Sequence, residues 1–130
     1  MIRALALALL APLLVAAKPA PDLARDFARA STPQAVAALA ERGQLVKIYL
    51  FPLEVGGPED PMNVAWVTPA ALRQAEAVTD KIIALLEQGK VDSLDVQPEY
   101  KGDSRIPSRI RYIATHKTGP AKLDRVVEVW

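Results

Sequence analysis

The segment from Thr68 to Gly89 constrains the fold most, because it combines a helix start signal, a helical period and a stop signal. Thr68 can cap a helix, and Pro69 has the fixed φ that suits the first turn. Apolar residues then recur at the spacing of one helical face, and Gly89 follows as the stop. These apolar residues are Leu72, Ala75, Val78, Ile82, Leu85 and Leu86. The pattern predicts one long helix whose apolar face must be covered by other elements.

Two strands are predicted before this helix. Residues 45–53 read LVKIYLFPL, and their β-branched, aromatic and aliphatic side chains favour a mostly buried strand that ends near Pro52. Residues 54–63 read EVGGPEDPMN, a composition typical of a loop. Residues 64–67 (VAWV) then predict a second, short strand.

A β-hairpin is predicted after the helix. Residues 91–100 and 105–115 alternate between apolar and polar side chains, and residues 101–104 have the length and composition of a tight connection. The valine-rich residues 126–130 indicate a last strand or a packed tail. The order of elements predicts an α+β fold, in which a small antiparallel sheet has one long helix packed on it.

A helical arm is predicted over residues 18–43, ahead of an α+β domain over residues 44–130. Asp22 is expected to cap a short helix, and Thr32 and Gly43 are expected to bound a second one. The apolar stripe of this arm is narrow and rich in alanine. We therefore expect the arm to lie on the domain and to stay outside its core.

Residues 1–17 (MIRALALALLAPLLVAA) have the three parts of a secretory signal peptide: a basic start at Arg3, an apolar centre and a small-residue cleavage site. The apolar run from Ala4 to Ala17 is shorter than the roughly 20 residues that a membrane-spanning helix needs. The sequence thus predicts export to the periplasm or the outside of the cell, with no membrane attachment after cleavage.

Charge and reactive-residue content narrow the possible chemistry. Removal of residues 1–17 takes away one basic residue and leaves 15 basic and 15 acidic residues, so no global attraction to nucleic acid or anionic lipid is expected. The chain has no cysteine and one histidine, His116, whereas a zinc site needs three or four ligands. We predict no catalytic residue, metal or cofactor. A weak hydrolytic site around His116, Asp103 and Glu99 remains an alternative.

One candidate binding surface is a row of basic side chains along the second strand of the hairpin. They are Arg105, Arg109 and Arg111, with Lys101 near one end. Such a row could bind phosphates or an acidic protein surface. The competing interpretation is cross-strand pairing with Asp95 and Glu99.

A second candidate surface is the loop that contains Gly56, Gly57 and Asn63. A binder of single-stranded nucleic acid would also need exposed aromatic rings among its basic residues. Tyr100 and Tyr112 fall on the apolar faces of the predicted strands, so we expect them in the core. The residues alone thus favour no particular ligand.

Residues 54–116 resemble the C-terminal half of bacterial DNA/RNA non-specific endonucleases, the ββα-metal nucleases found among secreted toxins. The stretch VGGPEDPMNVAWVTP (55–69) is similar to their Gly-Gly, Asn and Pro pattern before a long helix. The stretch LLEQGKVDSLDVQPEYKGDSRIPSRIRYIA (85–114) is similar to their closing strands. The resemblance implies a nuclease-like scaffold.

The resemblance also implies that the chemistry is missing. The family's general base is the His of an Asp-Arg-Gly-His segment before the Gly-Gly loop, but residues 47–53 here read KIYLFPL. The position of its metal-binding Asn falls on Ala75, which cannot ligate magnesium. The LFP, GG and YKGDS-IPS string further resembles small proteins of bacterial toxin–immunity gene neighbourhoods.

The sequence therefore predicts an exported, non-catalytic, immunity-like binding protein with a protein partner. The alternatives are a nucleic-acid- or phosphate-binding module that uses the arginine-lined strand face, and a divergent DNA/RNA non-specific endonuclease. The sequence leaves the oligomeric state open.

Overall fold

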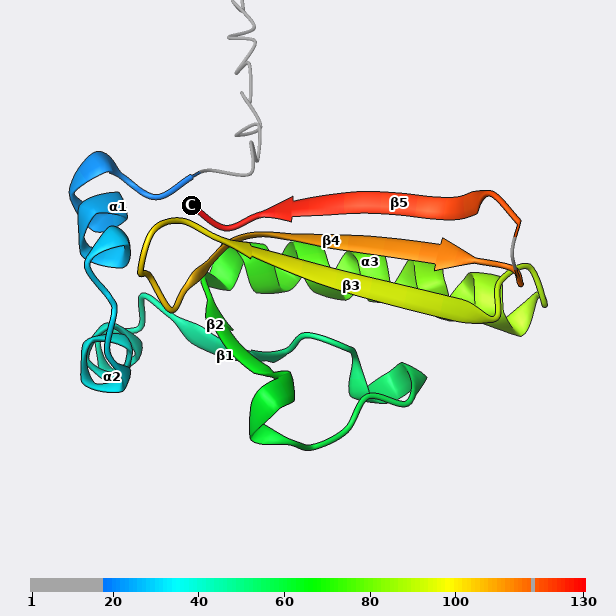
Figure 1. The fold of residues 1–130 in the computed structure, drawn as a ribbon, viewed down its shortest axis with the longest axis horizontal. Coiled ribbons are helices and arrows are strands. Elements are labelled where there is room, and N and C mark those ends of the chain that lie inside the picture. Colours follow the sequence, from blue (N-terminus) through cyan, green and yellow to red (C-terminus); the bar gives the residue numbers. More distant parts are fainter. Residues whose placement is uncertain (1–17, 118) are drawn as a thin grey trace, which may run out of the picture.

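Three α-helices and two antiparallel sheets make up the computed structural model, which describes residues 18–117 and 119–130 (Figure 1). This confirms the predicted α+β class. The predicted signal peptide, residues 1–17, lies outside the described residues. In chain order the elements are α1 (Pro21–Ala28), α2 (Pro33–Glu41), β1 (Val46–Tyr49), the 3₁₀ turns η1 (Leu53–Val55) and η2 (Pro61–Asn63), β2 (Val64–Val67), α3 (Pro69–Glu87), β3 (Ser93–Tyr100), β4 (Pro107–Thr115) and β5 (Ala121–Glu128).

The long helix and the hairpin form as predicted. The Thr68 hydroxyl accepts a hydrogen bond from Ala71 N at 3.1 Å at the start of α3, and Gly89 follows the helix with a φ of 67°. The larger sheet has the strand order β3-β4-β5, and α3 packs along one of its faces (Figure 1). The inward-facing side chains of β4 form the centre of the core together with α3; they are Ile110, Tyr112 and Ala114.

The first two strands form a sheet of their own, which corrects the expectation of a single sheet. Within the described residues, β1 pairs only with β2, with Val46 opposite Val67 and Tyr49 opposite Val64. The larger sheet ends at β3, where Pro98 has no N–H to donate to a further strand. The four-residue strands β1 and β2 therefore form a separate small sheet, in which β2 still contacts β4 of the larger one.

The N-terminal arm contributes to the core, so the expectation that it stays outside is wrong. Phe27 of α1 is fully buried, and its ring lies edge-on to Trp130 with 6.3 Å between centroids. The turn between β3 and β4 supplies polar partners: Ser104 Oγ donates to Phe27 O at 2.7 Å, and Arg105 N donates to Ala30 O at 2.9 Å. Phe27 O also accepts from Ala30 N at 3.1 Å, so the turn adds a second hydrogen bond to this carbonyl and gives Ala30 O a partner. These contacts and the buried ring hold the arm against the larger sheet.

Two boundaries differ from the sequence predictions. Asp22 does not cap α1; Ala20 occupies that position, and Asp22 lies in the first turn. β4 begins at Pro107 and not at Arg105, because the residues just before it bind the arm. At the other end of the chain, β5 is a full strand, and Val129 and Trp130 follow it as a buried tail.

Candidate binding groove

The arginines of the predicted row do not act together, because each one is bound to a different partner. Arg109 donates to Glu128 Oε1 at 2.9 Å, and its Nε lies 3.5 Å from Glu99 Oε2, an ion pair that lacks hydrogen-bond geometry. Arg111 donates two hydrogen bonds, of 2.9 and 2.6 Å, to the Asp124 carboxylate. The competing interpretation of cross-strand pairing is therefore confirmed for Glu99. The closest carboxylate to Arg111 comes from β5 and not from Asp95.

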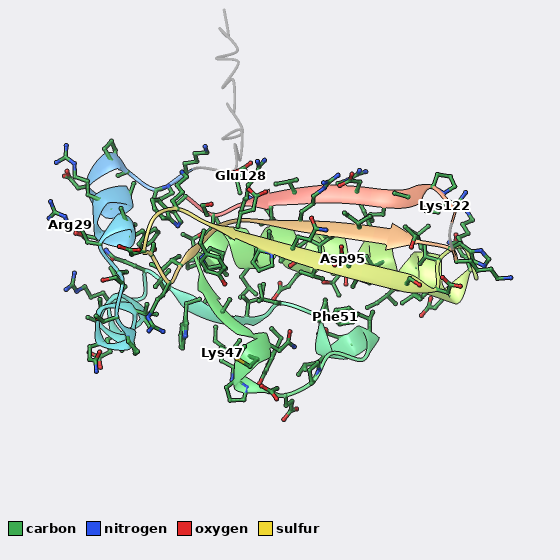
Figure 2. The ribbon with its side chains drawn as sticks, viewed as in Figure 1. Arg29, Lys47, Phe51, Asp95, Lys122 and Glu128 are labelled. Atoms are coloured by element: carbon green, nitrogen blue, oxygen red, sulfur yellow. The ribbon has the colours of Figure 1, made fainter. Side chains whose placement is uncertain are left out.

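Carboxylates outnumber arginines on this outer face of the larger sheet. The strand register places Asp95 and Glu99 on one side of β4, and Asp124 and Glu128 on the other, as Figure 2 shows for Asp95 and Glu128. Four carboxylates thus surround two guanidinium groups. A phosphate that approached Arg109 or Arg111 would have to displace the carboxylates that already pair with them, so the geometry disfavours phosphate binding here.

We expect the Asp124 carboxyl to titrate below the ordinary aspartate pKa of 3.8, because hydrogen bonds from Arg111 hold its pKa down. A folded-state pKa that is depressed contributes stability above the unfolded-state value, and that contribution is lost as the pH falls through the folded-state pKa. An NMR titration of the side-chain carboxyl measures this directly. Arg111→Gln should return the pKa of Asp124 toward 3.8, while Arg125→Gln, which removes a smaller influence, should change it less. An ordinary pKa in the unmodified protein would contradict the Arg111–Asp124 pairing.

The two remaining basic residues of the predicted row serve other contacts. Arg105 Nε donates to Ser31 O at 3.0 Å, on the arm. Lys101 Nζ donates to Trp130 O at 3.1 Å and lies 4.7 Å from the centre of the Trp130 ring. Arg105 precedes the first residue of β4, so it does not share the outer face of that strand with Arg109 and Arg111. The pairing of β3 with β4 is also irregular at this end, between Glu99 and Tyr100.

The three residues predicted as a binding loop organise that loop. The Asn63 side chain accepts from Phe51 N at 2.8 Å and donates to Phe51 O and Pro58 O, each at 2.9 Å. Gly56 ends η1 with a φ of 97°, and Gly57 N donates to Pro52 O at 2.9 Å. The polar atoms of Asn63 are therefore engaged within the loop, and it is only 8% exposed.

A groove of about 510 Å³ lies where sequence analysis did not place a site. Its walls come from α2, from one face of the β1–β2 hairpin, and from Tyr100 and Arg105 near the β3–β4 turn. The strand register puts Lys47 opposite Trp66, and Tyr49 two residues further along β1 on the same face. Tyr49, Trp66 and Tyr100 thus bring three aromatic rings from distant parts of the sequence to one groove.

The expectation that Tyr100 lies in the core is wrong, because this side chain is 49% exposed. It stands at the end of an edge strand, where the register becomes irregular and α3 no longer covers it. Tyr112, in contrast, is buried as predicted. In a strand, side chains two residues apart lie on the same face, so the sequence could have placed Lys47 with Tyr49 and Val64 with Trp66. This spacing would have predicted the hairpin part of the groove. The contribution of Tyr100 required the tertiary structure.

Charges around the groove are balanced. Lys47 and Arg105 line it together with Glu59 and Asp60. Lys47 Nζ lies 4.8 Å from the centre of the Tyr49 ring, and Asp60 Oδ1 accepts from Met62 N at 2.8 Å. Two prolines, Pro33 and Pro61, add rigid apolar surface. The arrangement can stack against apolar or planar groups while a few charges select the orientation of the ligand.

The residues of the alternative hydrolytic site, His116, Asp103 and Glu99, are not brought together. His116 follows the end of β4 near Lys90 and Lys122, whereas Glu99 pairs with Arg109 near the start of β4. Figure 2 places Lys122 and Glu128 at opposite ends of β5. Seven residues of extended chain between Arg109 and His116 correspond to about 23 Å. Within the described ranges, no three His, Cys, Asp or Glu side chains are grouped so that they could hold a metal ion.

No protein-family model matches the chain, and neither a curated protein nor a solved structure is significantly similar to it. The resemblance to DNA/RNA non-specific endonucleases therefore stays a prediction. Among the helices of residues 18–117 and 119–130, none is long and apolar enough to cross a membrane.

Proposed function

We propose that this protein is an exported, non-catalytic, immunity-like binding protein that holds an extended, proline-containing segment of a partner protein in the groove. The observation that carries the proposal is the convergence of Tyr49, Trp66 and Tyr100 on one groove. Grooves lined by aromatic rings bind polyproline II segments, because such segments are already extended and lose little entropy when they bind. The predicted signal peptide would deliver the protein to a periplasmic or extracellular partner.

The charge pattern favours a protein partner over a nucleic acid. Two basic and two acidic side chains line the groove, and the outer face of the larger sheet carries more carboxylates than arginines. Nucleic-acid binders gain most of their affinity by neutralising several phosphates, which needs an excess of basic groups. The shape of the groove suits either class of ligand, but its charge suits a peptide of low net charge.

We expect Tyr100→Ala to weaken peptide binding by about tenfold or more, because exposed aromatic residues that become buried on binding contribute most to such interfaces. Peptides would be selected from an array of proline-containing decamers with scrambled, proline-free counterparts. Their dissociation constants would then be measured by calorimetry. Val126→Ala is the matched control, since Val126 is 40% exposed but lies on the outer face of the larger sheet.

Three results would overturn the proposal: no decamer binds, the proline-free peptides bind equally well, or both variants lose affinity alike. A single-stranded oligonucleotide would be tested in parallel over a range of salt concentrations. Steeply salt-dependent binding that Tyr100→Ala abolishes would assign the groove to nucleic acid instead.

A further inference from the structure

A second hollow lies between α3 and the segment that runs from β1 into η1. This cleft has a volume of about 360 Å³, within the range of small-ligand sites. Most of its lining is apolar and includes Ile48, Leu53, Leu72, Ala75, Ile83 and Tyr112. The lining combines residues of β1 in the smaller sheet with Tyr112 of β4 in the larger one, so the cleft lies where the two sheets meet α3.

A buried phenol without a partner faces this cleft. Tyr112 is 1% exposed, and its hydroxyl makes no hydrogen bond within the part of the chain that the structure describes. Burial raises the pKa of Tyr112 to about 12, so the hydroxyl is neutral at physiological pH. The hydroxyl of Thr79, another buried residue of the lining, likewise has no hydrogen-bond partner among the described residues. Neither oxygen is among the fully enclosed side-chain atoms that lack a partner, so both open onto the cleft, where a ligand with a hydrogen-bonding group can pair with them.

Acidic side chains line the same cleft. Glu76 and Asp80 lie one turn apart on α3, and Glu54 stands on η1. Like charges at this helical spacing repel each other, and no described basic residue forms an ion pair with them. Lys47 also lines the cleft, so three carboxylates face one ammonium group. A cation at this rim would relieve the repulsion.

We propose that this cleft binds a small organic amine, with an ammonium group at the acidic rim, an apolar body against the walls and a hydrogen-bonding group that reaches Tyr112 and Thr79. Each part of this ligand is complementary to one feature of the cleft: the ammonium group to the carboxylates, the apolar body to the apolar lining, and the hydrogen-bonding group to the two hydroxyls. The proposal does not rest on the function of the aromatic groove.

Four small probes that share an aromatic body test the charge and the hydroxyl group separately. Tyramine has the ammonium, the ring and the hydroxyl; phenethylamine lacks the hydroxyl, 4-ethylphenol lacks the charge, and 3-(4-hydroxyphenyl)propionate reverses it. NMR shift titrations of the whole chain give each dissociation constant and map the site. We expect tyramine to bind about three- to tenfold more tightly than 4-ethylphenol, with shifts along α3, and the propionate to bind most weakly.

Two variants identify the residues responsible. The double variant Glu76→Gln/Asp80→Asn should remove the preference for tyramine over 4-ethylphenol, whereas Glu87→Gln, at the end of the same helix and outside the cleft, should keep it. Tyr112→Phe should remove the preference for tyramine over phenethylamine without lowering stability, because its hydroxyl has no partner to lose. A general structural defect would change all affinities alike.

The proposal is overturned if no probe binds at millimolar concentration, if the propionate binds as tightly as tyramine, or if the double variant keeps the original preference. Tyr100→Ala should leave tyramine binding unchanged, since Tyr100 does not line this cleft. Failure of the aromatic groove to bind peptides and failure of this cleft to bind amines are therefore separate results.

Discussion

Replacement of Phe27 by alanine is expected to lower the free energy of unfolding by about 3–5 kcal/mol. The side chain is fully buried, and its ring packs edge-on against Trp130 with 77° between the planes. Its removal leaves a cavity between α1 and the end of the larger sheet. The backbone around this cavity cannot move in to fill it, because Ser104 and Arg105 donate hydrogen bonds to the carbonyl groups of Phe27 and Ala30. Such a loss is a large part of the 5–15 kcal/mol that typically stabilises a domain.

Urea denaturation followed by circular dichroism measures this effect. Asp26→Ala, an exposed position on the same helix, is the control and should change stability by less than about 0.5 kcal/mol. A loss below about 1 kcal/mol for Phe27→Ala, or a first transition in which only the arm unfolds, would show that the arm is not part of the cooperative core.

Gly57→Ala is expected to destabilise the protein by about 3 kcal/mol, at the upper end of the usual cost of overpacking. A Cβ atom at this position would clash with the carbonyl oxygen of Phe51 and would stand 2.8 Å from its carbonyl carbon and 2.9 Å from Pro52 O. All three are backbone atoms, so no side chain can rotate away to make room. The backbone must shift, and the hydrogen bond from Gly57 N to Pro52 O would be strained.

Gly56→Ala separates this clash from the ordinary cost of a positive φ. A Cβ at Gly56 would meet open space, so only its φ of 97° opposes alanine, at about 1–2 kcal/mol. Thermal denaturation compares the loss of stability in the two variants. A loss for Gly57→Ala no larger than that for Gly56→Ala would contradict the close backbone contacts at Gly57. Because the loop contributes Glu59 and Asp60 to the aromatic groove and Glu54 to the amine cleft, Gly57→Ala should also weaken binding at both.

Several assignments were accessible from the sequence because their physical cause is local. The cap at Thr68, the helical period after it and the stop at Gly89 fix α3 within a few neighbouring residues. The alternation in β3 and β4 likewise places Asp95 and Glu99 on one face of the sheet and Leu94 and Val96 on the other. The interpretation that the arginine row pairs across the hairpin with Asp95 and Glu99 needed only this short-range register, and the Arg109–Glu99 ion pair bears it out for Glu99.

The candidate site was less accessible, because its residues acquire their roles from distant partners. Asn63 appeared to be a ligand-binding residue, since nothing in its neighbourhood shows that Phe51 and Pro58 engage its amide. Arg111 appeared to be available for a phosphate until β5 brought Asp124 beside it. Tyr100 looked like a core residue because its alternation matches Leu94 and Val96, although the sheet extends beyond its helix there.

By itself, the sequence determined the α+β class, the long helix, the hairpin and the lack of cysteine and of a second histidine. These follow from hydrogen bonding and side-chain period over a few residues, or from composition alone. Only the tertiary structure decided that the strands divide into two sheets, that the arm enters the core, and that an aromatic groove and an acidic-rimmed cleft lie on either side of Lys47 and Tyr49. The physical reason is that burial and pairing depend on which surfaces meet in space, and residues far apart in the chain supply those surfaces.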